Sequence, residues 1–220
     1  MQIKFQKKLD EYKYILSFDI ATHTGYSLYS IEEDKFITWG EIVVSDKDGF
    51  PPYVNFYYQL EDLLIKICSF VNNKAEVLCI KEKQVLQMMG HTTTVATIVN
   101  MAKLHAIFDE FMINSNIDVY DYEGLPVPTH KAYYRRVLGK KDITKQDVMK
   151  WVLGYYSISD KGITDNITDS MCFILPFMEK WNKDIDEEIR GLKREKKSLK
   201  MPKAIQERDD EIMRLSLLKI

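Results

Sequence analysis

Three acidic residues of this chain stand beside hydrophobic runs, where packing alone gives no reason for a charge. Asp19 directly follows the apolar stretch Tyr14–Phe18, and Glu82 lies two residues beyond Ile80, where another apolar stretch ends. Asp169 comes just before the run Ser-Met-Cys-Phe-Ile-Leu. A carboxylate that enters an apolar interior costs free energy unless it is paired or bound to a cation. The three acids are therefore candidates for one site, although an aspartate before a turn also suits ordinary turn chemistry.

A fourth acid, Asp165, belongs to the same segment as Asp169. If residues 163–175 form a helix, Asp165 and Asn166 precede Asp169 by four and three positions and lie beside it on one face. Asp165 is either a helix cap, a role that aspartate favours, or a further ligand. Asp169 lies one turn into a helix that enters the core, so capping explains it poorly.

The donor chemistry of these acids indicates a metal site. All of them offer oxygen, and no His/Cys cluster accompanies them, which favours Mg²⁺, or Mn²⁺ in its place, over zinc. Two such ions, roughly 4 Å apart, would activate a water and stabilise the leaving oxygen in phosphodiester cleavage. No Ser or Cys nucleophile stands out with its base, so hydrolysis by metal-held water is the predicted chemistry. The candidate ligands are Asp19, Glu82, Asp165 and Asp169.

Hydrophobic periodicity predicts the elements that position these acids. The predicted strands are Tyr14–Phe18, Gly25–Ser30, Lys35–Val44, Glu76–Ile80 and Ile117–Tyr122, with Thr24-Gly25 in the first turn. The predicted helices are Tyr53–Val71, Thr93–Ile113, His130–Leu138, Thr144–Tyr156 and Thr164–Met178. Early hairpins followed by alternating units indicate an α/β fold: a mixed five-stranded sheet, its first three strands antiparallel, covered by helices on both faces. Ligands gather where strands end, so Asp19 and Glu82 are expected at one rim.

Composition limits the class of protein. With 220 residues, 45% of them hydrophobic, the chain can bury a core. No apolar run is long enough to span a bilayer, and the polar N-terminus is no signal peptide. The three cysteines lie far apart in apolar runs and read as buried thiols, which fits a reducing, cytoplasmic setting.

Positive charge is concentrated in residues 129–150. The whole chain has a net charge of −2, which argues against indiscriminate coating of nucleic acid. That segment, however, carries seven basic residues against two acids and is a candidate phosphate-binding surface. A solvated helical face is the equally open alternative. The basic residues are Lys131, Arg135, Arg136, Lys140, Lys141, Lys145 and Lys150.

Taken in order, the motifs resemble one family over residues 14–178. The motifs are Asp19 with Thr24-Gly25, Ile80–Gln84, Pro128–Lys131, Val137–Lys140, Thr144–Val148 and Asp165–Met171. They are similar to those of RuvC-type Holliday-junction resolvases, and they resemble the phage-encoded branch of that family most. The resemblance implies an RNase H-like fold and a homodimer that uses Mg²⁺ to nick branched DNA, especially four-way junctions, symmetrically on two strands.

The resemblance also assigns roles to residues. It implies that Asp19, Glu82 and Asp169 bind metal, with Asp165 or Asn166 completing the set. It further implies that Lys131 and Lys145 contact the phosphate backbone, and that Lys145 neutralises charge at the scissile phosphate. These contacts would make affinity depend on salt.

Two departures from the family pattern keep other functions open. Lys81 separates the apolar strand from Glu82, and in a strict register it would take the ligand position, because a one-residue slip exchanges the faces of a strand. Either a bulge shifts Glu82 into place or the strand ends one residue early. Asn166 stands where cellular relatives carry an acid or histidine. The alternatives are a branched-DNA-binding module without full metal coordination, or a nuclease for forks and flaps.

The chain is expected to divide into a nuclease domain, 1–178, and a charged helical extension, 179–220. The extension holds twelve basic and ten acidic residues. Its apolar residues, at near-heptad spacing in two short helices separated by Pro202, are Ile185, Ile189, Leu192, Leu199, Ile212, Leu215 and Leu218. The extension would widen the dimer interface, fold back on its own domain, carry Lys193–Lys203 onto DNA, or form a solvated amphipathic helix.

Overall fold

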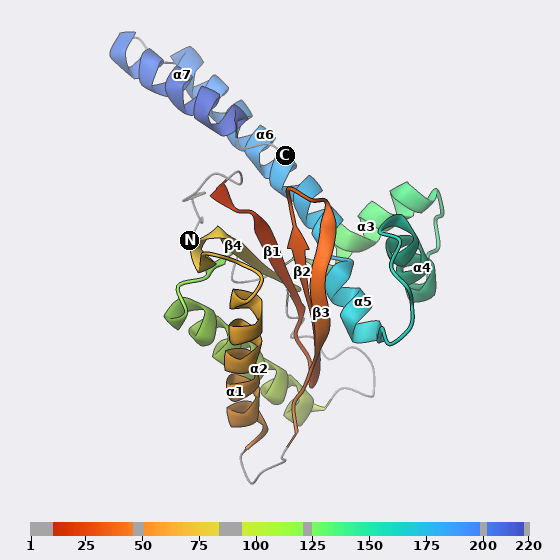
Figure 1. Cartoon of the computed structure of the whole chain (residues 1–220). Coiled ribbons are helices and arrows are strands. Elements are labelled where there is room, and N and C mark those ends of the chain that lie inside the picture. The colour runs from red at the N-terminus through yellow and green to blue at the C-terminus, as the bar shows by residue number, and fades with distance from the viewer. Residues whose placement is uncertain (1–10, 46–50, 84–93, 121–124, 199–201, 218–220) are drawn as a thin grey trace. The chain divides into compact units, whose positions relative to one another are not determined.

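The computed structural model describes residues 11–45, 51–83, 94–120, 125–198 and 202–217, and their elements follow the expected order (Figure 1). The strands are β1 (Tyr14–Asp19), β2 (His23–Ser30), β3 (Lys35–Val43), β4 (Val77–Lys81) and β5 (Asp118–Val119). The helices are α1 (Pro52–Cys68), the 3₁₀ turn η3 (Lys74–Glu76), α2 (Val95–Asn114), α3 (Val127–Leu138), α4 (Lys145–Tyr155), α5 (Asp165–Met171), α6 (Ile174–Ser198) and α7 (Pro202–Ser216).

The five strands form one mixed sheet in the order β3-β2-β1-β4-β5. The pairs β1–β2 and β2–β3 are antiparallel, and the pairs β1–β4 and β4–β5 are parallel. The predicted fold class is therefore confirmed. Strand β1 is central, and β4 runs beside it in the same direction, so the two strands carry their C-terminal residues to the same edge.

Side chains of β1 point alternately to the two faces of the sheet, and each face is covered by its own layer of helices. Leu16 and Phe18 are buried in the core that α1 and α2 cover. Ser17 points to the other face, where its hydroxyl donates to the backbone oxygen of Ser170 in α5 at 2.7 Å. Since side chains alternate along a strand, Asp19 lies on the α5 face with Ser17. In Figure 1, α1 and α2 flank one side of the sheet and α3, α4 and α5 the other.

Helix α5 lies directly on β2 at Gly25. A Cβ atom at this position would lie 1.8 Å from the backbone oxygen of Asn166, closer than any side chain tolerates. Strand β2 begins at His23, so the predicted strand from Gly25 is confirmed, whereas the expectation that Thr24-Gly25 forms the turn was wrong. The turn lies just before it, where the Thr24 hydroxyl donates to the backbone oxygen of Ala21 at 2.6 Å.

We expect Gly25→Ala to destabilise the protein by about 3 kcal/mol, because the added methyl collides with backbone rather than with a side chain that can rotate away. The control is Gly154→Ala in α4, where an added Cβ meets nothing within 4 Å and removes a helical glycine. Chemical denaturation of both variants checks this. Equal stability of Gly25→Ala and the parent would contradict the close packing of α5 on β2.

The predicted helix Thr164–Met178 is divided in the structure. Helix α5 ends at Met171, and α6 begins at Ile174. Pro176 explains the division: it lacks the N–H that a continuous helix would need there, whereas the first turn of a new helix accepts it. The acids of the segment therefore lie on a short helix of their own.

The described residues fall into two compact units, one of Tyr12–Ile174 and one of Glu11 with the residues from Leu175 onward. Within the second unit, α6 and α7 are joined by ion pairs, among them Lys196 Nζ with Asp209 Oδ2 at 2.6 Å. Of the predicted apolar residues, Ile185, Ile189 and Leu215 are buried, Leu192 and Ile212 are partly buried, and Leu199 and Leu218 lie outside the described residues. The role of this extension and the boundary at residue 178 stay predictions. No helix in the described ranges is long and apolar enough to cross a membrane.

Candidate active site

The parallel register of β1 and β4 brings Asp19 and Glu82 side by side. The strands pair without interruption up to Phe18 and Lys81, and the Glu82 N–H then donates to the Phe18 oxygen at 3.3 Å. The next level of the sheet therefore holds Asp19 and Glu82. On the side away from β1, Glu82 forms a parallel bridge with Leu125.

Lys81 points away from this site. Its side chain is only 2% exposed and forms an ion pair with Asp109 of α2, near the ring of Phe108. Glu82, one residue later, faces the opposite side of the sheet, with Asp19. The register question raised by the sequence is thus answered without a bulge: Lys81 belongs to the α2 face, and the acid after it reaches the α5 face.

Helix α5 places Asp169 opposite these two acids. Thr164 is the N-cap, and its hydroxyl accepts from the Ile167 N–H. Asp165 therefore occupies the first turn instead of capping, and its side chain is 69% exposed. Asp169, one turn further, is largely buried, and its Oδ2 lies 2.6 Å from Lys145 Nζ, which is 3.7 Å from Asp165 Oδ2.

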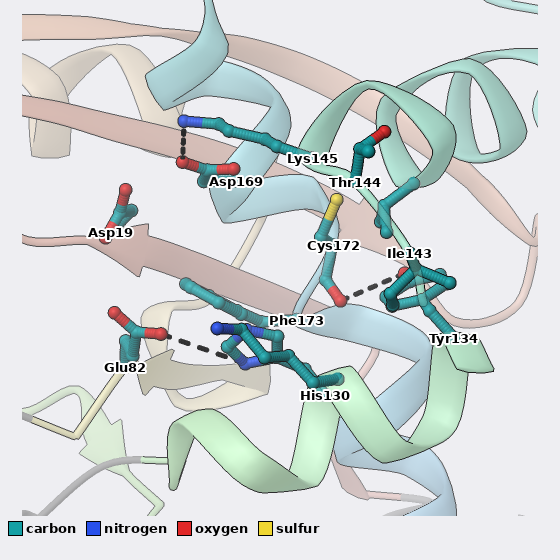
Figure 2. Close-up of a pocket in the computed structure, with 12 residues that line it drawn as sticks. Asp19, Glu82, His130, Tyr134, Ile143, Thr144, Lys145, Asp169, Cys172 and Phe173 are labelled. Carbon is teal, nitrogen blue, oxygen red and sulfur yellow. Dashed lines mark hydrogen bonds and ion pairs between the residues drawn. The ribbon is translucent and has the colours of Figure 1, made fainter. Parts of the chain in front are cut away.

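These side chains surround a pocket of about 410 Å³. Figure 2 shows Asp19, Glu82 and Asp169 reaching from three elements toward the same space, with Lys145 against Asp169. The lining residues are Asp19, Glu82, His130, Lys131, Tyr134, Ile143, Thr144, Lys145, Val148, Asp169, Cys172 and Phe173. Helices α3 and α4 supply the wall that faces the sheet's edge.

The pocket disfavours negative charge on its own acids. Burial, together with the charge of Asp169, raises the pKa of Asp19 to about 6. Burial and the charges of Asp19 and Asp169 raise the pKa of Glu82 to about 7. Burial also raises the pKa of Asp169, against the opposing effect of Lys145. For Lys145, the neighbouring acids outweigh burial and raise its pKa, so it stays charged.

The acids fit divalent cations by chemistry, because hard oxygen donors crowded in a buried place are stabilised by a cation. Across the ranges that the structure describes, no three His, Cys, Asp or Glu side chains already form a metal-binding group. The carboxylates instead face one another across the pocket, with Lys145 beside one of them (Figure 2).

Not every predicted residue reaches the pocket. Lys131 and Lys145 line it, whereas Asp165 stays at its rim. Asn166 points to β3, where its amide donates to Glu41 Oε1 at 2.6 Å. The remaining predicted DNA-binding residues are exposed on α3 and in the turn that follows it, and they do not line the pocket: Arg135, Arg136, Lys140 and Lys141.

His130 is a pocket residue that the motifs contain but to which the sequence assigned no role. Its Nδ1 lies 3.8 Å from Glu82 Oε1, and its ring packs against Phe173. Burial, with the charge of Lys131, lowers the pKa of His130 to about 4, so the ring is neutral. Its four-residue spacing from Tyr134, which is buried and donates to the Cys172 oxygen, is the signal that marks the inward face of α3.

No protein-family model matches this chain, and no curated protein matches it. The solved structures that are similar to it include two of RuvC. T. thermophilus RuvC in complex with Holliday junction substrate has a TM-score of 0.53 and 10% identity, covering 74% of this chain and 91% of that one. The Thermus thermophilus RuvC structure has a TM-score of 0.53 and 12% identity, covering 74% and 92%. The chain therefore has the RuvC-like, RNase H-like fold that its motifs predict.

Proposed function

We propose that this protein is a metal-dependent, structure-specific endonuclease that cleaves four-way junctions and related branched DNA. One observation carries the proposal: three acids from β1, the end of β4 and α5 line one pocket together with Lys131 and Lys145. The fold that holds this pocket is similar to that of a RuvC bound to a Holliday junction, which supports branched DNA as the substrate.

In this proposal Asp19, Glu82 and Asp169 hold two Mg²⁺ or Mn²⁺ ions, with Asp165 at the rim as a further ligand. Such ions supply an activated water and stabilise charge on the leaving oxygen. Lys145, already beside Asp169, would turn toward the scissile phosphate and neutralise part of its charge. Lys131, in the same pocket, would hold the adjoining backbone.

We also propose a homodimer, so that one subunit nicks each of two strands. Helix α2 supports it, because one of its faces exposes apolar side chains at a 4-3-4 spacing: Val95, Val99, Ala102 and Ala106. Val95 is 62% exposed, and the two alanines would let a second helix approach closely. An exposed apolar strip of this kind is typical of an interface.

The test is cleavage of an end-labelled synthetic four-way junction in Mg²⁺ and in Mn²⁺, with linear duplex of the same sequence as the control. Paired, symmetric nicks in the junction alone support the proposal. Tight junction binding without cutting in either metal would refute the enzyme and leave the second candidate, a branched-DNA-binding module. That candidate is favoured by the lack of a preformed metal group among the described residues. A forked and a flapped duplex in the same assay test the remaining substrate alternative.

The exposed basic residues of α3 and the following turn are expected to set the salt dependence of DNA binding. Removing one phosphate contact, by Arg135→Gln or Lys141→Gln, should lower the slope of log K against log salt by about 0.9, and the double variant by about twice that. Lys103→Gln, an exposed charge on α2 across the sheet, is the control. Junction affinities measured at several salt concentrations check this, and unchanged slopes would mean that these residues form only a solvated face.

The phage-encoded branch and the cytoplasm of a host cell remain predictions from motifs and composition.

A further inference from the structure

Three acids and a glycine lie side by side in one row across the strands of the sheet. Register pairs Asp19 with Gly25 on β2, and Gly25 with Glu41 on β3. Glu82 is level with Asp19 on the other side. Residues paired directly across strands share a face, so Glu41 belongs to the α5 face, two strands away from Asp19.

Asn166 spans the gap that Gly25 leaves in this row. Its backbone oxygen lies 1.8 Å from the place that a Cβ of Gly25 would occupy, and its side-chain amide donates to Glu41 Oε1 at 2.6 Å. The same Glu41 oxygen lies 3.1 Å from His23 Nδ1. The backbone of Asn166 therefore packs against the sheet at Gly25, and its side chain is hydrogen-bonded to the sheet, three residues before Asp169.

We propose that Glu41 and Asn166 form a clamp that fixes the start of α5 on the sheet and thereby sets where Asp169 lies relative to Asp19 and Glu82. Asn166 is then a positioning residue and not a ligand. The meaning of the clamp for cleavage rests on the proposed nuclease function, but the clamp itself can be tested without DNA or metal.

Asn166→Asp separates the two roles, because it exchanges a donor for a carboxylate of nearly the same shape. In a clamp, the new carboxylate faces Glu41 at hydrogen-bond distance and repels it. At a ligand position, the same carboxylate would add a donor and tighten cation binding. The double variant Glu41→Gln/Asn166→Asp, called the exchanged pair below, reverses the hydrogen bond, since the Gln amide can then donate to the Asp carboxylate.

The first experiment is thermal unfolding in EDTA. We expect Asn166→Asp to lower the melting temperature by about 4 °C or more, and the exchanged pair to recover most of that loss. Asn72→Asp, an exposed asparagine between α1 and β4, is the matched control and should leave the melting temperature unchanged.

Mn²⁺ titration and junction assays on the same proteins complete the test. Well below its melting temperature, Asn166→Ala should bind the junction with unchanged Kd but cut about tenfold more slowly, and the exchanged pair should restore the rate that Asn166→Asp loses. An unchanged melting temperature with tighter Mn²⁺ binding in Asn166→Asp would overturn the clamp, as would failure of the exchanged pair to recover stability. If the parent does not cut DNA, the nuclease proposal fails, while unfolding and Mn²⁺ binding still decide on the clamp.

Discussion

Asp19→Asn and Glu82→Gln should each reduce junction cleavage about 10³-fold or more in single-turnover assays at saturating protein. Both substitutions keep the shape of the side chain and remove a charge that lies level with the other in the sheet. If the acids hold cations, losing either charge weakens the site where negative charge develops during hydrolysis. Asp62→Asn, an exposed acid of α1, serves as the control and should cut at the parental rate.

Binding of the junction should survive both substitutions. The acids repel phosphate when no cation is present, so their removal leaves Kd in EDTA unchanged or lower. A gel-shift titration in EDTA measures this. Cleavage at the parental rate in Glu82→Gln would remove Glu82 from the site, and a large loss of binding in EDTA would point to damaged folding instead of lost catalysis.

Without divalent metal, the parent should become progressively less stable than the Asp19→Asn/Glu82→Gln variant as pH rises from about 4 to about 7. The pKa values of Asp19 and Glu82 are raised on folding, to about 6 and about 7, chiefly because burial disfavours their ionised forms. At these two acids the folded state binds more protons than the unfolded state, so their contribution to the free energy of unfolding falls with rising pH. The largely buried histidines His105 and His130, whose pKa values are lowered to about 4, contribute in the opposite sense up to about pH 6.5, and the Asp19→Asn/Glu82→Gln variant keeps that contribution. The loss is of the order of 1–3 kcal/mol for each acid, less wherever solvent screens the charge.

Mg²⁺ or Mn²⁺ should restore the lost stability, and more so at pH 7.5 than at pH 5, because the cation competes with protons for the carboxylates. Urea denaturation at several pH values, with EDTA and with Mn²⁺, checks both halves of the prediction. The Asp19→Asn/Glu82→Gln variant should lack the part of the pH dependence that comes from these acids and should lose the effect of metal. A difference in stability between parent and variant that stays constant in EDTA between pH 5 and 7, or an equal effect of Mn²⁺ at both pH values, would contradict the origin assigned to these pKa values.

Much of the fold could be predicted because local patterns decide it. The strands around Leu16 and Leu78 and the helix around Leu60 bury regular sets of apolar side chains, and the mixed sheet follows from the order of these elements. The amphipathic pattern is weak in α2, where apolar residues are found on both the buried and the exposed sides of the helix. The sequence therefore could not show which of them face the core, as Phe108 does, and which, like Val99, stay exposed.

The acids of the candidate site could be predicted from the sequence, but the contacts that position the neighbouring residues could not. Asp19, Glu82 and Asp169 stand out locally, since each is a charge beside an apolar run. The partners of Lys81 and Asn166 are set by pairing between distant segments, with Asp109 and Glu41 respectively, and no local spacing encodes such contacts. His130 likewise acquires its place only when α3 packs over the end of β4.

The opposite directions of Lys81 and Glu82 affect how this chain can be compared with others. A motif that requires the acid directly after an apolar residue will skip this sequence, or will treat Lys81 as an insertion and leave a gap. Such a gap would assign Glu82 to the position of Lys81, on the wrong side of the sheet, because β4 pairs with β1 without interruption up to Lys81. Lys81 is better aligned with the last core position of the strand, where its long buried side chain takes the place of an apolar one and its charge is paired with the partly buried Asp109.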